Sequence, residues 1–274
     1  MTVTTQPAAP TRRIPVSSMP EAGGDGEAGQ MTMMEHLAEL RRRLIISFVS
    51  IGVGAIAAWV LYPEIITILL EPYCDTLETG EECQLYVRNP LEPFSVRLTV
   101  AGYGGVIAAL PIILWQVWRF IAPGLYAHEK RYAVPFIMGG VLLFFLGAGL
   151  AYWSIPRALT FLGEVGGDDF TELFAPGDYL GFVIKMIVAF GIGFEFPILL
   201  IFLQLLGIVQ YRTLTKGRQY AIVGIVVLVA VITPSGDPFT LMVLSVPMYL
   251  FYETSIAFGW IRTRRARKRA APLA

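Results

Sequence analysis

The sequence is poor in the residues that enzymes use for nucleophilic and metal chemistry. Its 274 residues include only two cysteines and two histidines. The histidines, His36 and His128, both lie in segments rich in basic residues, and no HExxH, GxSxG or ATP-binding motif is present. Because neither a nucleophile–base pair nor a metal-ligating cluster is visible, we predict a protein that is not an enzyme and needs no cofactor or metal.

Charged residues are also scarce, at 15% of the chain, whereas hydrophobic residues make up 55%. This is more apolar surface than a soluble domain of this length buries in one core, so lipid must solvate part of it. The apolar residues gather in six runs, at about 44–62, 94–118, 133–153, 180–207, 220–232 and 240–259. Most runs approach the roughly 20 residues that a helix needs to cross a ~30 Å hydrocarbon layer.

The runs are continuously apolar and do not alternate with a period of two, which excludes the strands of a transmembrane barrel. We therefore predict an all-α, polytopic membrane protein with six transmembrane helices. The fifth run is short, since residues 221–232 rise only about 18 Å. Four prolines within or at the ends of runs favour kinks, because each removes a backbone hydrogen bond: Pro111, Pro135, Pro197 and Pro247.

The charges and the two polar ends predict the topology. Basic residues gather before the first run, in every second loop and after the sixth run, whereas the other three loops are dense in carboxylates. Because positively charged loops stay in the cytoplasm, we expect both termini there. Residues 1–32 are rich in Pro, Gly, Ala, Thr and Ser and predict a disordered leader.

A transmembrane domain is expected over residues 33–261, beginning with an interfacial helix at 33–43. The basic tail, 262–274, is suited to anionic lipid headgroups. Nucleic acid would use the same residues, but no fold to present them is evident, so we expect lipid and no nucleic acid.

The cysteines, Cys74 and Cys83, both lie in the first loop predicted to be extracytoplasmic. An oxidising compartment would let them form a disulfide that closes the loop. The alternative is a pair of free thiols.

Two carboxylates lie in segments predicted to face the cytoplasm. Glu39 precedes the first run, and taken alone it is an ordinary surface residue at pairing distance from Arg42 or Arg43. Glu129 follows a Pro-Gly turn in a connector that is too apolar for an ordinary loop. Two such carboxylates can accept two guanidinium groups in bidentate pairs that lysine cannot reproduce.

A third carboxylate, Glu195, falls in the middle of the fourth run. An ionisable side chain there costs at least ~2.5 kcal/mol unless it is protonated, paired or hydrated, so a functional role is the first hypothesis. The alternative is a neutral Glu that is hydrogen-bonded to a neighbouring helix. Gly191 and Gly193 favour close approach of another helix nearby.

Four motifs stand in order along the chain. They are His36-Leu-x-Glu39-Leu-Arg41, Phe120-Ile-Ala-Pro-Gly-Leu125-x-x-x-Glu129, Phe190-Gly191-x-x-Phe194-Glu195-x-Pro197, and Thr233-Pro234 followed by Pro247-Met248-Tyr249 and Glu253. In this order across six runs, they resemble the TatC family, the large subunit of the twin-arginine protein translocase. The resemblance runs from about His36 to Phe258.

The resemblance implies a bacterial cytoplasmic-membrane protein whose kinked helices form a concave, glove-like bundle with Glu195 in its cavity. It implies that Glu39 and Glu129, supported by Phe120, recognise the arginine pair in signal peptides of folded cargo. It also implies export driven by the proton-motive force, with TatA-like and TatB-like single-span partners and a homo-oligomer within the complex. Asp237 and Thr240, around the turn between the fifth and sixth runs, are the expected partner contacts.

A secondary transporter or channel is the main alternative, since one buried carboxylate and kinked helices would serve proton coupling. Against it, the runs show no repeat between the two halves and only one deep charge. An intramembrane enzyme ranks third, for want of a catalytic motif.

Overall fold

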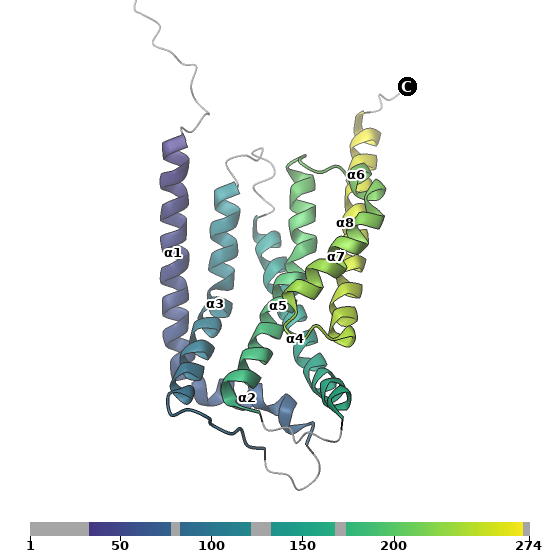
Figure 1. The fold of residues 1–274 in the computed structure, drawn as a ribbon. Helices are drawn as coiled ribbons and strands as arrows, with labels where there is room; N and C mark the ends of the chain where they lie inside the picture. The colour runs from purple at the N-terminus through teal and green to yellow at the C-terminus, as the bar shows by residue number, and fades with distance from the viewer. Residues whose placement is uncertain (1–32, 78–82, 122–132, 168–173, 271–274) are drawn as a thin grey trace, which may run out of the picture. The chain divides into compact units, whose positions relative to one another are not determined.

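The structure, a computed structural model, describes residues 33–77, 83–121, 133–167 and 174–270. All regular secondary structure in these ranges is helical (Figure 1), which confirms the predicted all-α class. The helices are α1 (Met33–Val60), α2 (Tyr62–Cys74), α3 (Glu92–Ile121), α4 (Ala133–Gly166), α5 (Pro176–Leu205), α6 (Tyr211–Lys216), α7 (Arg218–Ile232) and α8 (Pro238–Ala270). The predicted leader, 1–32, lies outside the described residues.

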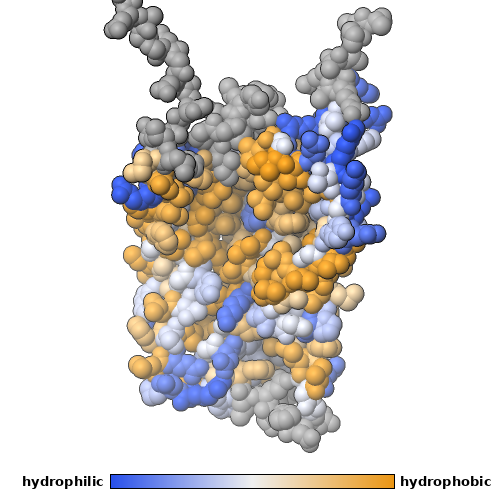
Figure 2. All heavy atoms as spheres, turned by 45° about the horizontal axis from the view of Figure 1, so that its top comes forward, coloured by the Kyte–Doolittle hydropathy of each residue, from blue (hydrophilic) through white to orange (hydrophobic). Residues whose placement is uncertain are grey.

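Five of these helices, α1, α3, α4, α5 and α8, are long and apolar enough to cross a membrane. The surface in Figure 2 is mostly hydrophobic, as expected of helices that face lipid. The remaining apolar helix, α7, has 15 residues and therefore rises only about 22 Å. The fifth predicted span is thus present as a short helix, and the count of six spans stays a prediction.

Several helices extend beyond the apolar runs that predicted them. The expected interfacial segment and the first span form one continuous helix, α1. The chain forms two compact units, which meet at Glu39 and Leu40, and the described part of the first unit is the start of α1, Met33–Glu39. Helix α4 continues past residue 153 to Gly166. Helix α8 continues through most of the basic tail to Ala270, so the predicted domain boundary at 261 is not a helix end.

Helix α5 forms the centre of the second unit. Half of its apolar window is buried, against 6% for α1. One core cluster joins α5 to α4, α7 and α8 around Phe190 and Met248, and another joins it to α2, α3 and α4 around Ile155 and Val183. Because two independent cores share this helix, the position of any side chain on α5 is tightly fixed.

Glycine allows α4 and α5 to cross at close range. A Cβ on Gly147 would lie 2.5 Å from the Phe190 carbonyl oxygen, and a Cβ on Gly191 would lie 2.4 Å from the Phe144 ring. Small residues at a crossing let helix backbones approach, which is the usual source of helix packing in lipid.

Candidate functional site

Glu195 lies near the middle of α5, with its carboxylate against the two preceding long helices. A Cβ on Gly140 of α4 would lie 3.0 Å from Oε2 and 3.2 Å from Oε1 of Glu195, and 2.8 Å from Cδ1 of Leu114 on α3. Among the described residues, Oε1 is buried and has no hydrogen-bond partner. A buried oxygen without a partner is costly, so this group is suited to receive a proton, a water or a polar ligand.

An exposed strip runs along the same helix beside Glu195. It consists of Lys185, Ile192 and Leu199, which share one face because they are seven residues apart. The Ile192 and Leu199 side chains are 57% and 53% exposed, although α5 is otherwise the most buried long helix. Glu195 is three residues from Ile192 and therefore borders the strip.

The other predicted recognition residues are described only in part. Glu39 is half-buried on α1, and Phe120 is half-buried one residue before the end of α3. Glu129, with the Pro-Gly turn before it, lies outside the described residues. The assignment of these three residues to one site therefore stays a prediction.

Asp237 and Thr240 together cap the start of α8. Oδ1 of Asp237 accepts a hydrogen bond from the Thr240 backbone N–H at 2.8 Å, and Oδ2 accepts one from the Thr240 hydroxyl. This is the arrangement of an aspartate N-cap, which satisfies a free N–H of the first turn. Asp237 is 3% exposed and Thr240 is fully buried, so both side chains are engaged inside the turn.

Next to this turn, α7 and α8 form an apolar groove of about 320 Å³. Its lining includes Ile222, Val226, Met242, Ser245, Val246 and Tyr249. The Ser245 hydroxyl is buried there and, within the described part of the chain, has no hydrogen-bond partner. The sequence analysis missed this serine, although a polar residue between two large apolar residues of a span is a signal that was available.

Glu253, near the middle of α8, ties that helix to the start of α7. Arg218 on α7 donates to Oε2 of Glu253 at 2.7 Å, and the Tyr249 hydroxyl donates to Oε1 at 2.9 Å. The last motif found in the sequence thus includes an ion pair that holds the short helix α7 against α8.

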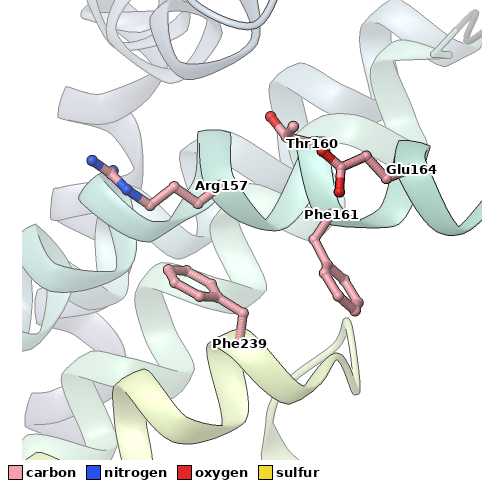
Figure 3. Close-up of a pocket in the computed structure, with 5 residues that line it drawn as sticks. All are labelled: Arg157, Thr160, Phe161, Glu164 and Phe239. Carbon is pink, nitrogen blue, oxygen red and sulfur yellow. The ribbon is translucent and has the colours of Figure 1, made fainter.

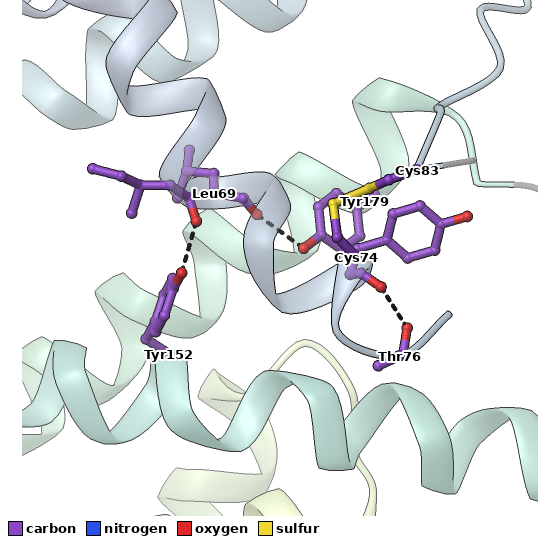
Figure 4. Close-up of a disulfide and its surroundings, with 8 residues drawn as sticks. Leu69, Cys74, Thr76, Cys83, Tyr152 and Tyr179 are labelled. Carbon is purple, nitrogen blue, oxygen red and sulfur yellow. Dashed lines mark hydrogen bonds between the residues drawn. A yellow bond between two sulfur atoms is a disulfide. The ribbon is translucent and has the colours of Figure 1, made fainter. Parts of the chain in front are cut away.

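At one end of the helix bundle, α2 lies across the ends of the long helices (Figures 1 and 4). Pro72 has no N–H to donate to the Ile68 carbonyl one turn earlier, and the Tyr152 hydroxyl of α4 donates to that oxygen at 2.9 Å. The Tyr179 hydroxyl of α5 donates to the Leu69 carbonyl at 2.9 Å. Two tyrosines from different helices therefore fix this crossing helix.

A disulfide between Cys74, at the end of α2, and Cys83 closes the loop after this helix (Figure 4). Beyond it, Glu92 at the start of α3 reaches to α5, where Oε1 accepts a hydrogen bond from the Gly177 N–H at 3.0 Å. This carboxylate caps the N-terminus of the central helix. No group of three or more potential metal ligands occurs in the described ranges.

Comparison with known proteins identifies the family. The family model for the Sec-independent protein translocase protein TatC matches residues 35–247. A TatC protein of Aquifex aeolicus is 41% identical over 87% of this chain and 98% of its own length, and one of Frankia casuarinae is 34% identical over 89% and 69%.

A solved structure described as "Crystal Structure of Twin Arginine Translocase Receptor- TatC" is 39% identical and superposes with a TM-score of 0.70 over 84% of this chain and all of that chain. The chain therefore belongs to the TatC family of Sec-independent protein translocase proteins, as a multi-pass membrane component of that translocase.

Proposed function

We propose that the protein is the receptor subunit of a twin-arginine translocase in a bacterial cytoplasmic membrane, with both termini in the cytoplasm. The observation that carries the proposal is the likeness to a solved translocase receptor over that receptor's whole chain. The ligand is the signal peptide of a folded protein, and the proton-motive force drives export.

The arginine pair of the signal peptide binds Glu39 and Glu129, and Phe120 packs beside it. Both carboxylates belong to segments that the charge distribution assigns to the cytoplasm. A planar guanidinium group forms two parallel hydrogen bonds with a carboxylate, whereas a lysine ammonium acts as a point charge. Specificity for arginine follows from this geometry.

The apolar part of the peptide lies along the exposed strip of α5. Ile192 and Leu199 offer apolar contact, and Glu195 at the edge offers a carboxylate. A peptide placed there would give the buried Oε1 oxygen a hydrogen-bond partner.

TatA-like and TatB-like helices dock in the groove between α7 and α8, with the Ser245 hydroxyl as their polar contact. Asp237 and Thr240 hold the turn that shapes one end of this groove. Several copies of the chain assemble in the complex. The basic end of α8, which includes Arg264, Arg265 and Lys268, binds anionic lipid headgroups at the cytoplasmic surface.

The test is the affinity of a twin-arginine signal peptide for the full-length protein in lipid nanodiscs. We expect Glu39→Ala and Glu129→Ala each to weaken binding by roughly tenfold or more, since each removes a charge-assisted bidentate contact. A peptide with two lysines should bind wild type about as weakly. Glu64→Ala, which removes an exposed carboxylate of α2, is the matched control and should leave affinity unchanged.

Equal binding of both peptides by wild type and by all variants would contradict the receptor assignment. In that case the buried Glu195 would instead favour a proton-coupled transporter, and flux of small solutes would be the next measurement.

A further inference from the structure

A separate pocket lies on the C-terminal part of α4, about five to seven turns from the Gly140 position that faces Glu195. Arg157, Thr160, Phe161 and Glu164 of α4 and Phe239 of α8 line this pocket of about 290 Å³ (Figure 3). Arg157 and Glu164 are two turns apart, so a cation and an anion stand roughly 10 Å apart along one helix. The rings of Phe161 and Phe239 lie between α4 and α8.

Arg157 is held in position by its own helix. Its Nη1 donates to the Trp153 carbonyl oxygen at 2.7 Å, and its guanidinium carbon lies 3.9 Å from the centre of the Trp153 ring. In the described part of the chain, neither Arg157 nor Glu164 forms an ion pair. Among the described residues, the pocket therefore presents two opposite charges that have no ion-pair partner.

The length of α4 and the sequence predict that the pocket lies at the depth of the lipid headgroups. Helix α4 has 34 residues and is about 51 Å long, which exceeds a ~30 Å hydrocarbon layer by several turns. Tyr152 and Trp153 mark the expected membrane interface, and the pocket residues follow them. Leu162 and Val165 in the same segment are 40% and 71% exposed, as expected of a helix that borders acyl chains.

We propose that this pocket binds the headgroup of a zwitterionic aminophospholipid, such as phosphatidylethanolamine. The lipid phosphate accepts hydrogen bonds from Arg157, and the ammonium group donates to Glu164 beside the Phe161 ring. An anionic headgroup without an amine leaves Glu164 unpaired near a negative charge. A choline headgroup has no N–H to donate to Glu164.

Phe239 links the proposed lipid site to helix α8. This residue comes two positions after Asp237, the cap of α8, so a lipid in the pocket joins the outer part of α4 to the α7–α8 turn. The proposal goes beyond the receptor function, because it needs neither signal peptide nor partner subunits.

The test uses the full-length protein in nanodiscs that contain equal amounts of phosphatidylethanolamine, phosphatidylcholine and phosphatidylglycerol. Native mass spectrometry after release counts the lipids retained. Wild type should retain phosphatidylethanolamine preferentially, and Arg157→Gln and Glu164→Gln should each lower that retention by about three- to tenfold. Arg88→Gln and Glu64→Gln remove exposed charges on the same side of the protein and should change nothing.

Three outcomes would overturn the proposal. Retention that is unchanged in both variants shows that the lipid binds elsewhere. Equal retention of phosphatidylglycerol, lost in Arg157→Gln alone, shows a simple phosphate site. A photo-crosslinker at position 161 that labels a polypeptide instead of phosphatidylethanolamine shows a protein partner. As a control, each variant should unfold near the wild-type temperature, which establishes that the loss of lipid retention is local.

Discussion

Glu195 is a residue at which stability and function should respond in opposite directions. Its Oε1 is buried without a hydrogen-bond partner among the described residues, and its carboxylate lies against Gly140 of α4. Removing such a group relieves a desolvation cost of about 1–3 kcal/mol. We therefore expect Glu195→Leu to raise the unfolding temperature in detergent while it abolishes export.

Glu195→Gln separates the two hypotheses for this residue. Glutamine keeps the size and the hydrogen-bonding atoms but cannot ionise. Export measured in cells should fall strongly, whereas peptide affinity at the cytoplasmic site should stay at the wild-type value. Normal export by Glu195→Gln would show that the residue serves only as a neutral hydrogen-bonding group.

The prominence of Glu195 was predictable from sequence, but its surroundings were not. A carboxylate inside an apolar run is visible without any structure. Gly140 is one of two adjacent glycines in the third run, and nothing local indicates which one faces Glu195. Asp237 and Thr240 carried a clearer signal, because an aspartate three residues before a threonine at the start of an apolar run is a helix cap.

At the scale of elements, the sequence predicted the long helices that face lipid, but it did not predict α2, which is held by contacts with other helices. Long apolar runs predicted α1, α3, α4, α5 and α8, since backbone groups in lipid must be bonded within the helix. Helix α2 contains Pro63, Glu64, Glu71 and Pro72, which obscure its apolar face. Its missing hydrogen bond is supplied by a tyrosine more than 80 positions away in the sequence.

Tyr152→Phe tests this account of α2. Removing the hydroxyl leaves the Ile68 carbonyl without its donor, because Pro72 cannot replace it, and it also frees the Glu71 carboxylate. We expect a loss of about 1 kcal/mol in local stability. Hydrogen exchange of the α2 amides should accelerate roughly fivefold.

Tyr179→Phe is the matched variant for that measurement. The Leu69 carbonyl that Tyr179 contacts also has the N–H of Tyr73 one turn later, so it keeps a helical hydrogen bond. Exchange in α2 should therefore change less than in Tyr152→Phe. The opposite order would mean that Pro72 is not the reason for the Tyr152 contact.

At the scale of the whole molecule, α1 packs against the other helices through a small contact surface. Only 6% of its apolar window is buried, and it meets α3 where Gly105 approaches the backbone of Ile51 and Ala55. A second contact lies at the outer end, where Arg97 donates to the Trp59 carbonyl at 3.0 Å. Since α1 also carries Glu39, this attachment bears on the recognition of signal peptides.

Gly105→Leu should detach α1 from α3. A Cβ at this position would lie 2.6 Å from the Ile51 carbonyl oxygen and 2.7 Å from the Ala55 nitrogen, so the backbones must separate. Overpacking of this kind costs about 1–3 kcal/mol. Spin labels at the exposed positions Val53 and Val106 should move apart, and peptide affinity should fall because Glu39 moves with the helix.

Gly102→Leu provides the control on the same helix, because a Cβ on Gly102 meets no other atom within 4 Å. The two variants add the same side chain and differ only in whether α1 is displaced. If Gly102→Leu weakened peptide binding as much as Gly105→Leu, the added bulk and not the position of α1 would be responsible. If Gly105→Leu separated the spin labels without weakening binding, Glu39 would not belong to the recognition site, and the receptor function would rest on groups outside α1.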